Sequence, residues 1–122
     1  MNLRAGVDLG GTSVLILTTT GRKSGEERLA PLIYGMASDK DPMIVASKGG
    51  HPEHPGWYRN LQENPKVQVQ IRGDKFDAVA RDATPDERPE LWKQMTQEWP
   101  AYDDYQKKTD REIPIVILER TE

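Results

Sequence analysis

Residues 14–25 of this chain read VLILTTTGRKSG, an apolar, β-branched run followed by a turn flanked by glycines. The run predicts a β-strand over residues 14–20, because β-branched side chains pack well on a pleated surface. Arg22, Lys23 and Ser24 then gather two cations, a hydroxyl and the amides of a turn at the strand end. That combination suits an anionic ligand, although a solvated hairpin tip has the same composition. The stretch predicts a strand that leads into a candidate anion site.

Alternation with a period of two marks a second hairpin. Residues 67–72, VQVQIR, put apolar side chains on one face and polar ones on the other, between Pro65 and Gly73, which is typical of a half-buried strand. Gly73 and Asp74 are expected to form the turn into the next strand, and residues 39–42 another turn. Strands are predicted over residues 14–20, 29–34, 43–47, 67–72, 76–83 and 113–119.

Three helices are expected. Residues 84–87, TPDE, form a capping box with proline at the first helical position, so a helix should begin at Thr84. Another helix is expected over residues 56–63, and a short one through Tyr102 and Tyr105. The helix that follows the capping box should lie on the sheet through an apolar stripe. This stripe consists of Leu91, Trp92, Met95 and Trp99, before Pro100.

Composition limits the class of protein. The chain has 122 residues, a net charge of −3 and no cysteine, so a single α+β domain over residues 1–122 is expected, with residues 1–13 poorly specified. The acidic balance argues against a nucleic-acid partner. No apolar stretch is long enough to span a bilayer and no signal-peptide pattern opens the chain, so a cytoplasmic location is expected.

Three motifs have less specific interpretations. Residues 8–12, DLGGT, look like the phosphate loop of the sugar-kinase group, but that fold needs two large lobes and this chain is too short for them. His51, Glu53 and His54 lie close together, yet flanking prolines stiffen the loop and no other His or Cys can complete a metal site, so no metal is expected. Asp103 and Asp104 are neighbours on a helix and point in different directions, which makes them a poor catalytic pair.

Cations and aromatic residues elsewhere favour a ligand site over a plain hairpin tip. Arg28 lies on the next strand, Lys48 ends the third, and Arg59 follows Trp57 and Tyr58 on the short helix. If the strands close into a barrel, these positions can meet at one rim, with cations for an acidic tail and aromatic rings for a flat one. The candidate residues for a substrate pocket share one helical face, and they are Trp99, Tyr102 and Tyr105.

The chain resembles the deazaflavin (F420)-dependent nitroreductase family. The similarity runs from residue 14 to residue 119 through several motifs in the same order. The motifs are LTTTGRKSG at 17–25, VASKGG at 45–50, GWYRNL at 56–61, NPKVQVQI at 64–71, ARDAT at 80–84, YDDYQ at 102–106 and TDREIPIV at 109–116. The resemblance implies a split β-barrel of about six mainly antiparallel strands with two to three helices packed outside.

The resemblance also implies a function and a set of site residues. Reduced coenzyme F420 would pass a hydride to an electron-poor quinone, activated enone or nitroaromatic. Implied contacts to the phosphate and oligoglutamate tail come from Arg22, Lys23, Ser24 and Arg28. Those around the deazaflavin come from Val45, Ala46, Ser47, Lys48, Gly56, Trp57, Tyr58, Arg59, Asn60 and Tyr102. Ser47, Tyr102 and Tyr105 are the candidate catalytic residues, which orient the acceptor or supply a proton.

Alternatives stay open at this point. One is a deazaflavin carrier without turnover, and another is an FMN- or haem-binding split barrel. Four cations along one rim favour the cofactor with the longer anionic tail over FMN, which has a single phosphate. The implied partner is a small-molecule hydride acceptor, with a monomer or homodimer expected and peripheral membrane contact through a quinone left open. The family often has an aromatic residue where this chain has Ile33, and a tyrosine where it has Trp99.

Overall fold

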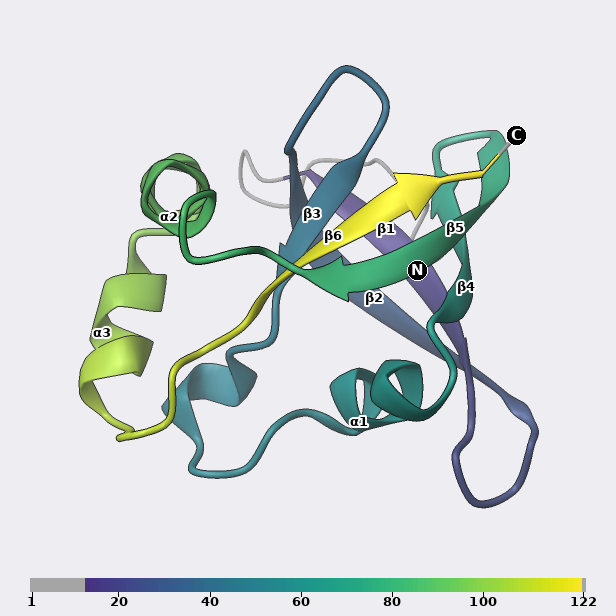
Figure 1. Ribbon diagram of the computed structural model, residues 1–122, viewed down its shortest axis with the longest axis horizontal. Coiled ribbons are helices and arrows are strands. Elements are labelled where there is room, and N and C mark those ends of the chain that lie inside the picture. The colour runs from purple at the N-terminus through teal and green to yellow at the C-terminus, as the bar shows by residue number, and fades with distance from the viewer. Residues whose placement is uncertain (1–12, 122) are drawn as a thin grey trace, which may run out of the picture.

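The computed structural model describes residues 13–121, so the DLGGT motif lies outside the described residues. Figure 1 shows a strand barrel with helices packed around it. The elements, in chain order, are β1 (Val14–Thr20), β2 (Glu27–Met36), β3 (Pro42–Val45), the 3-10 turn η1 (Lys48–Gly50), α1 (Gly56–Glu63), β4 (Lys66–Ile71), β5 (Asp74–Asp82), α2 (Arg88–Glu98), α3 (Ala101–Lys107) and β6 (Ile115–Arg120).

The strands pair antiparallel in the order β1-β2-β3-β6-β5-β4, and β4 pairs back to β1 to close the barrel. In Figure 1, α1 and η1 lie on the side of the barrel to which the β1–β2 turn projects, whereas α2 packs beside β2 and β6. α3 contacts both η1 and α2. The architecture confirms the α+β split barrel that the resemblance implied.

Two strand ends differ from the sequence prediction for one reason, which is Pro114. In the register of β3 and β6, Val45 pairs with Ile115, so the next pair would be Ala46 with Pro114. The Ala46 amide donates to the Pro114 carbonyl (3.0 Å), but proline has no amide hydrogen to return. β3 therefore ends at Val45 and not at Ser47, and β6 begins at Ile115 and not at residue 113.

β2 is longer than expected and is only partly covered. It pairs with β1 from Glu27 to Ile33, whereas β3 pairs with β2 only through residues 34–36. The stretch of β2 before Tyr34 thus pairs with β1 on one side, and its other edge faces away from the ladder. Pro31 lies in this stretch, where proline is tolerated because an edge position does not need its missing amide donor.

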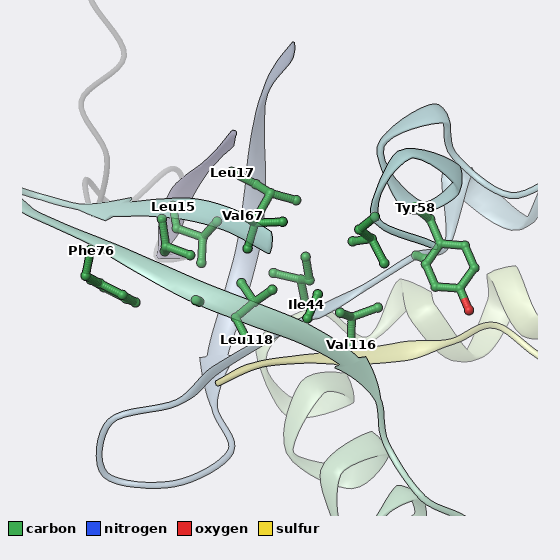
Figure 2. Packing of buried hydrophobic residues seen from close by; sticks show 13 residues of the cluster. Leu15, Leu17, Ile44, Tyr58, Val67, Phe76, Val116 and Leu118 are labelled. Carbon is green, nitrogen blue, oxygen red and sulfur yellow. The ribbon is translucent and has the colours of Figure 1, made fainter. Parts of the chain in front are cut away.

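Two hydrophobic clusters hold the molecule together. The first fills the barrel, and Figure 2 shows how its side chains, from β1, β3, β4, β5, β6 and α1, point toward one another. It includes Leu15, Leu17, Ile44, Val69 and Leu118. The second lies where α2 and α3 pack on the barrel, and it includes Met43, Leu91, Met95, Tyr102 and Ile113. Because the second cluster contains Tyr102, the short helix α3 is fixed by packing.

α2 begins later than the capping box predicted. The Thr84 amide donates to Glu87 Oε1 (2.9 Å), and the Glu87 amide donates to Thr84 Oγ1 (3.2 Å), so the box itself forms. Residues 85–87 are a turn, however, and the helix starts at Arg88. Pro89 explains the delay, because without an amide hydrogen it cannot donate to the carbonyl of residue 85.

Trp99 departs from the predicted apolar stripe. Leu91 and Met95 are buried as expected, but Trp99 follows the end of α2 and is 37% exposed.

The turn after β4 also differs from the sequence prediction, by one residue. Ile71 pairs with Asp74, so Arg72 and Gly73 form the turn, with Arg72 in the left-handed region at φ 56°.

Candidate functional site: a groove along strand β2

The turn after β1 forms the cationic end of a surface groove. A cavity of about 460 Å³ is lined by residues 21–24, 28–30, Gly56, Trp57 and Asn60. Arg28 has only an exposed ion pair with Glu26 (Nη1 to Oε2, 3.7 Å) and a contact with Ser24 Oγ (3.4 Å). Exposed pairs of this kind contribute little to stability, so the Arg28 guanidinium can exchange its partner for an anionic ligand.

Asn60 fixes this end of the groove to α1. Its side chain is buried, and its Nδ2 donates to Thr19 Oγ1 (3.2 Å). Its Oδ1 accepts from both the Arg22 amide (3.2 Å) and Arg22 Nη1 (2.8 Å). A single amide group therefore ties the end of β1, the hairpin turn and the helix together, and it holds the Arg22 guanidinium on the groove wall.

The aromatic end of the groove adjoins the cationic end. A cavity of about 440 Å³ is lined by residues 31–33 and 47–49 together with Val45, Pro55, Trp57, Trp99, Tyr102 and Tyr105. Trp57 lines both cavities, and consecutive residues of β2 are divided between them, with 28–30 in one and 31–33 in the other. We call these two neighbouring cavities together the β2 groove, because both lie along the part of β2 that β3 leaves uncovered.

Two tyrosines and a tryptophan close the aromatic end. Tyr102 is 5% exposed, and its ring meets the Tyr105 ring edge-on at 6.2 Å between centroids. Burial raises the pKa of the Tyr102 hydroxyl, and Tyr105 raises it further. Trp99 Nε1 donates to the Tyr105 hydroxyl at 3.4 Å, which leaves the Tyr105 proton available to another acceptor. Tyr102 therefore keeps its hydroxyl proton near neutral pH and is able to donate a hydrogen bond.

Most of the predicted site residues meet in the β2 groove, but Ala46, Tyr58 and Arg59 do not line it. Ala46 is fully buried in the barrel cluster. Tyr58 lies at the α1 end of that cluster (Figure 2), and its hydroxyl donates to Asp82 (2.8 Å to Oδ2). Arg59 is exposed on α1. These three residues are neighbours in the chain of residues that line the groove, but they do not line it themselves.

Sequence reasoning missed the β2 edge residues and Arg111. Leu29 is 67% exposed, which is unusual for a large apolar side chain and fits its place at the groove mouth. Arg111 lies within the TDREIPIV motif without an assigned role, yet its guanidinium contacts the segment that carries Ser47 and Lys48. No local signal marks Arg111, because its partners lie about sixty residues away.

Other features were also considered as sites. His51 Nδ1 accepts from the Glu53 amide (3.0 Å), and His54 Nδ1 lies 3.1 Å from Arg111 Nη1, so both rings hold the loop in shape.

A cavity of about 420 Å³ lies on the outer face of β1, β4 and β5. Its charged residues, Glu27, Lys66 and Asp77, have mixed sign and no aromatic ring joins them. Among residues 13–121, no helix is long and apolar enough to cross a membrane.

Comparisons with known proteins find related sequences and folds. The chain is 40% identical to an F420H(2)-dependent quinone reductase of Mycobacterium tuberculosis strain H37Rv over 115 residues, which is 91% of this chain and 76% of that relative. A solved F420-H2 dependent reductase, FDR-A, matches with a TM-score of 0.79 and 43% identity, covering 87% of this chain and 93% of the other. A solved domain-swapped dimer matches with a TM-score of 0.80 and 43% identity, covering 87% of this chain and 79% of the other.

The family model described as F420H(2)-dependent quinone reductase matches residues 1–120. It confirms the resemblance inferred from the motifs, including its cofactor and its reductase class. On this match and the 40% identical relative, the chain belongs to the F420H(2)-dependent quinone reductase family.

Proposed function

We propose that this chain transfers a hydride from reduced F420, held in the β2 groove, to a quinone-class acceptor. The observation that carries the proposal is the junction at Trp57 between a cationic cavity and an aromatic one. A cofactor with a flat ring and a long acidic tail needs both kinds of surface at once. When bound, reduced F420 supplies a hydride, and the protein supplies position and electrostatics.

Arg22, Lys23, Ser24 and Arg28 bind the phosphate and acidic tail in this proposal. Arg22 is held in place by Asn60, while Lys23 and Arg28 are exposed and free to adapt to a tail of variable length. Charge-assisted hydrogen bonds to phosphate and carboxylate are about twice as strong as neutral ones. The cationic end therefore provides most of the affinity, and this affinity should weaken as salt screens the charges.

Val45, Ser47, Lys48, Gly56 and Trp57 form the walls around the ring in this proposal. The acceptor enters past Trp99 and lies beside Tyr102 and Tyr105. Hydride transfer to a quinone leaves negative charge on an oxygen, and a hydroxyl aimed at that oxygen stabilises the charge or donates a proton. Ser47, Tyr102 and Tyr105 are the hydroxyl groups that the groove offers at this end.

Binding measurements separate this proposal from the alternatives. Titration of the protein with F420, FMN and haem, followed by quenching of tryptophan fluorescence, should show tight binding of F420 alone. Trp57 and Trp99 line the groove, so a bound ring should quench them directly. Tight FMN binding without F420 binding would overturn the cofactor assignment. Consumption of reduced F420 on addition of a soluble quinone distinguishes a reductase from a carrier, since a carrier would leave it unconsumed.

The assembly and location of the chain also belong to the proposal. The proposal includes a monomer or a homodimer, and the similar solved structure described as a domain-swapped dimer supports the homodimer. Light scattering at several protein concentrations measures the mass directly. We keep a cytoplasmic location, with peripheral membrane contact through a quinone as the open point, which co-sedimentation with quinone-loaded vesicles tests.

A further inference from the structure

Three consecutive residues beside the aromatic end of the β2 groove have left-handed backbone conformations. Lys48, Gly49 and Gly50 have φ values of 47°, 62° and 82°. A non-glycine residue in this region is uncommon and persists only where the surroundings fix it. The same short turn brings Lys48 and Gly49 into the groove lining, next to Ser47. Something outside the turn must therefore hold its shape.

Arg111 contacts the backbone on both sides of this left-handed turn. Before the turn, its Nη2 donates to the Ser47 carbonyl (2.7 Å) and its Nη1 to the Ala46 carbonyl (3.2 Å). After the turn, its Nε donates to the His51 carbonyl (2.8 Å). Nη1 also lies 3.1 Å from His54 Nδ1. Arginine has no acceptor, so His54 Nδ1 accepts this hydrogen bond and carries no proton.

Hydrogen bonds to the backbone around Arg111 fix the position of this residue. Gln106 of α3 donates from Nε2 to the Arg111 carbonyl (2.8 Å) and accepts at Oε1 from the Ile113 amide (2.9 Å). Gly50 packs against α3 so closely that a Cβ there would lie 2.6 Å from the Tyr105 carbonyl oxygen. The helix that carries Tyr102 and Tyr105 therefore supports both Arg111 and the turn that Arg111 holds.

We propose that Arg111 is the positioning residue of the β2 groove, a clamp that holds the left-handed turn 48–50 so that Ser47 and Lys48 face the cofactor ring. The inference rests on the proposed function for the identity of the ring, but the clamp itself does not depend on it. The planar guanidinium suits this task because its donors form a rigid fork, which a lysine ammonium cannot reproduce.

Amide hydrogen exchange of the cofactor-free protein tests the clamp. In R111Q, the amides of Gly50 and His51, which donate to the Ser47 and Lys48 carbonyls, should exchange about tenfold faster than in the wild type, because local opening costs less. R81Q is the matched control. Arg81 of β5 makes ion pairs with Glu87, in the turn before α2, and with Glu119 of β6, so its loss should destabilise the fold without changing these amides selectively. Wild-type exchange in R111Q would overturn the proposal.

Affinity for oxidised F420 tests the consequence for the groove. R111Q should bind it about tenfold more weakly than R81Q, because misplaced walls lose contacts even when the cations remain. R111K should also speed amide exchange and weaken F420 binding, but by less than R111Q. If R111Q does not fold, R111K takes its place in both measurements. Faster exchange with wild-type affinity would overturn the positioning role. If the wild type does not bind F420, the proposed function fails, and hydrogen exchange still decides the clamp.

Discussion

The two ends of the β2 groove are built in opposite ways. At the cationic end, Lys23 on the hairpin turn and Arg28 at the start of β2 are exposed side chains, and one buried amide, Asn60, connects that turn to the body of the protein. At the aromatic end, Tyr102 is buried in a hydrophobic cluster, and Arg111 holds the backbone of the wall from both sides. The contrast suggests that one end provides affinity through adaptable charge and the other provides rate through fixed geometry.

The largest effect should come from the hydroxyl groups of the aromatic end. The double variant Tyr102→Phe/Tyr105→Phe should lower kcat for quinone reduction about 1000-fold, a typical loss when a positioned proton donor is removed. Its affinity for F420 should change less than about twofold, since no charge is lost. Stopped-flow oxidation of reduced F420 measures the rate. A wild-type rate in the double variant would remove both tyrosines from the chemistry.

Reversal of charge at the cationic end should act on affinity instead. Lys23→Glu/Arg28→Glu should weaken F420 binding about 150-fold, because two exposed charged hydrogen bonds at the lower end of roughly 1.5–3 kcal/mol each together contribute about 3 kcal/mol. The deazaflavin without its phosphate and tail should bind this variant and the wild type alike. Lys40→Glu/Lys75→Glu reverses two exposed lysines outside the groove lining and should leave both affinities unchanged. Equal loss for the tailless ring would contradict the separation of roles.

Two neighbouring glycines measure how tightly the aromatic end is held. Gly50→Ala places a Cβ 2.6 Å from a backbone oxygen of α3, whereas Gly49→Ala meets nothing within 4 Å. Both residues are left-handed, so each variant carries a backbone penalty of about 1 kcal/mol, and Gly50→Ala should lose about 2 kcal/mol or more in total. Urea unfolding measures both losses. Equal losses would show that η1 is not packed against α3.

The smallest effect concerns pH and His54, which faces Arg111, Asp82 and Arg59. Burial and then Arg111 lower the pKa of His54 below 6.5, Asp82 opposes this shift, and Arg59 adds to it. The folded state thus binds the proton less readily than the unfolded state. The stabilising contribution is complete above pH 6.5 and is lost as the pH falls through the folded pKa. In His54→Gln, the urea midpoint should change less between pH 7 and about pH 5.5 than it does in the wild type. An equal change with pH in both proteins would exclude this contribution.

The same contrast explains what could be predicted from the sequence. The cationic end is local, so residues 14–25 alone predicted the first strand and the turn with its cations. α1 was predicted with its observed bounds, because glycine and proline mark its ends. The aromatic end is not local. The strand ends at Val45 and Ile115 depend on which residue faces Pro114, and Arg111 acts on carbonyls about sixty residues away. Neither follows from periodicity, because the barrel register sets both.

A chemical-shift map tests the proposed site most directly. Titration of 15N-labelled protein with oxidised F420 should shift the amides of residues 21–24, 28–30, 47–49, 56, 57 and 60 together, since these residues line the β2 groove. Residues 66–68 and 77–79, which line the outer-face cavity, should stay unchanged. Shifts confined to that outer face, with the groove amides unmoved, would contradict the site proposed for the cofactor.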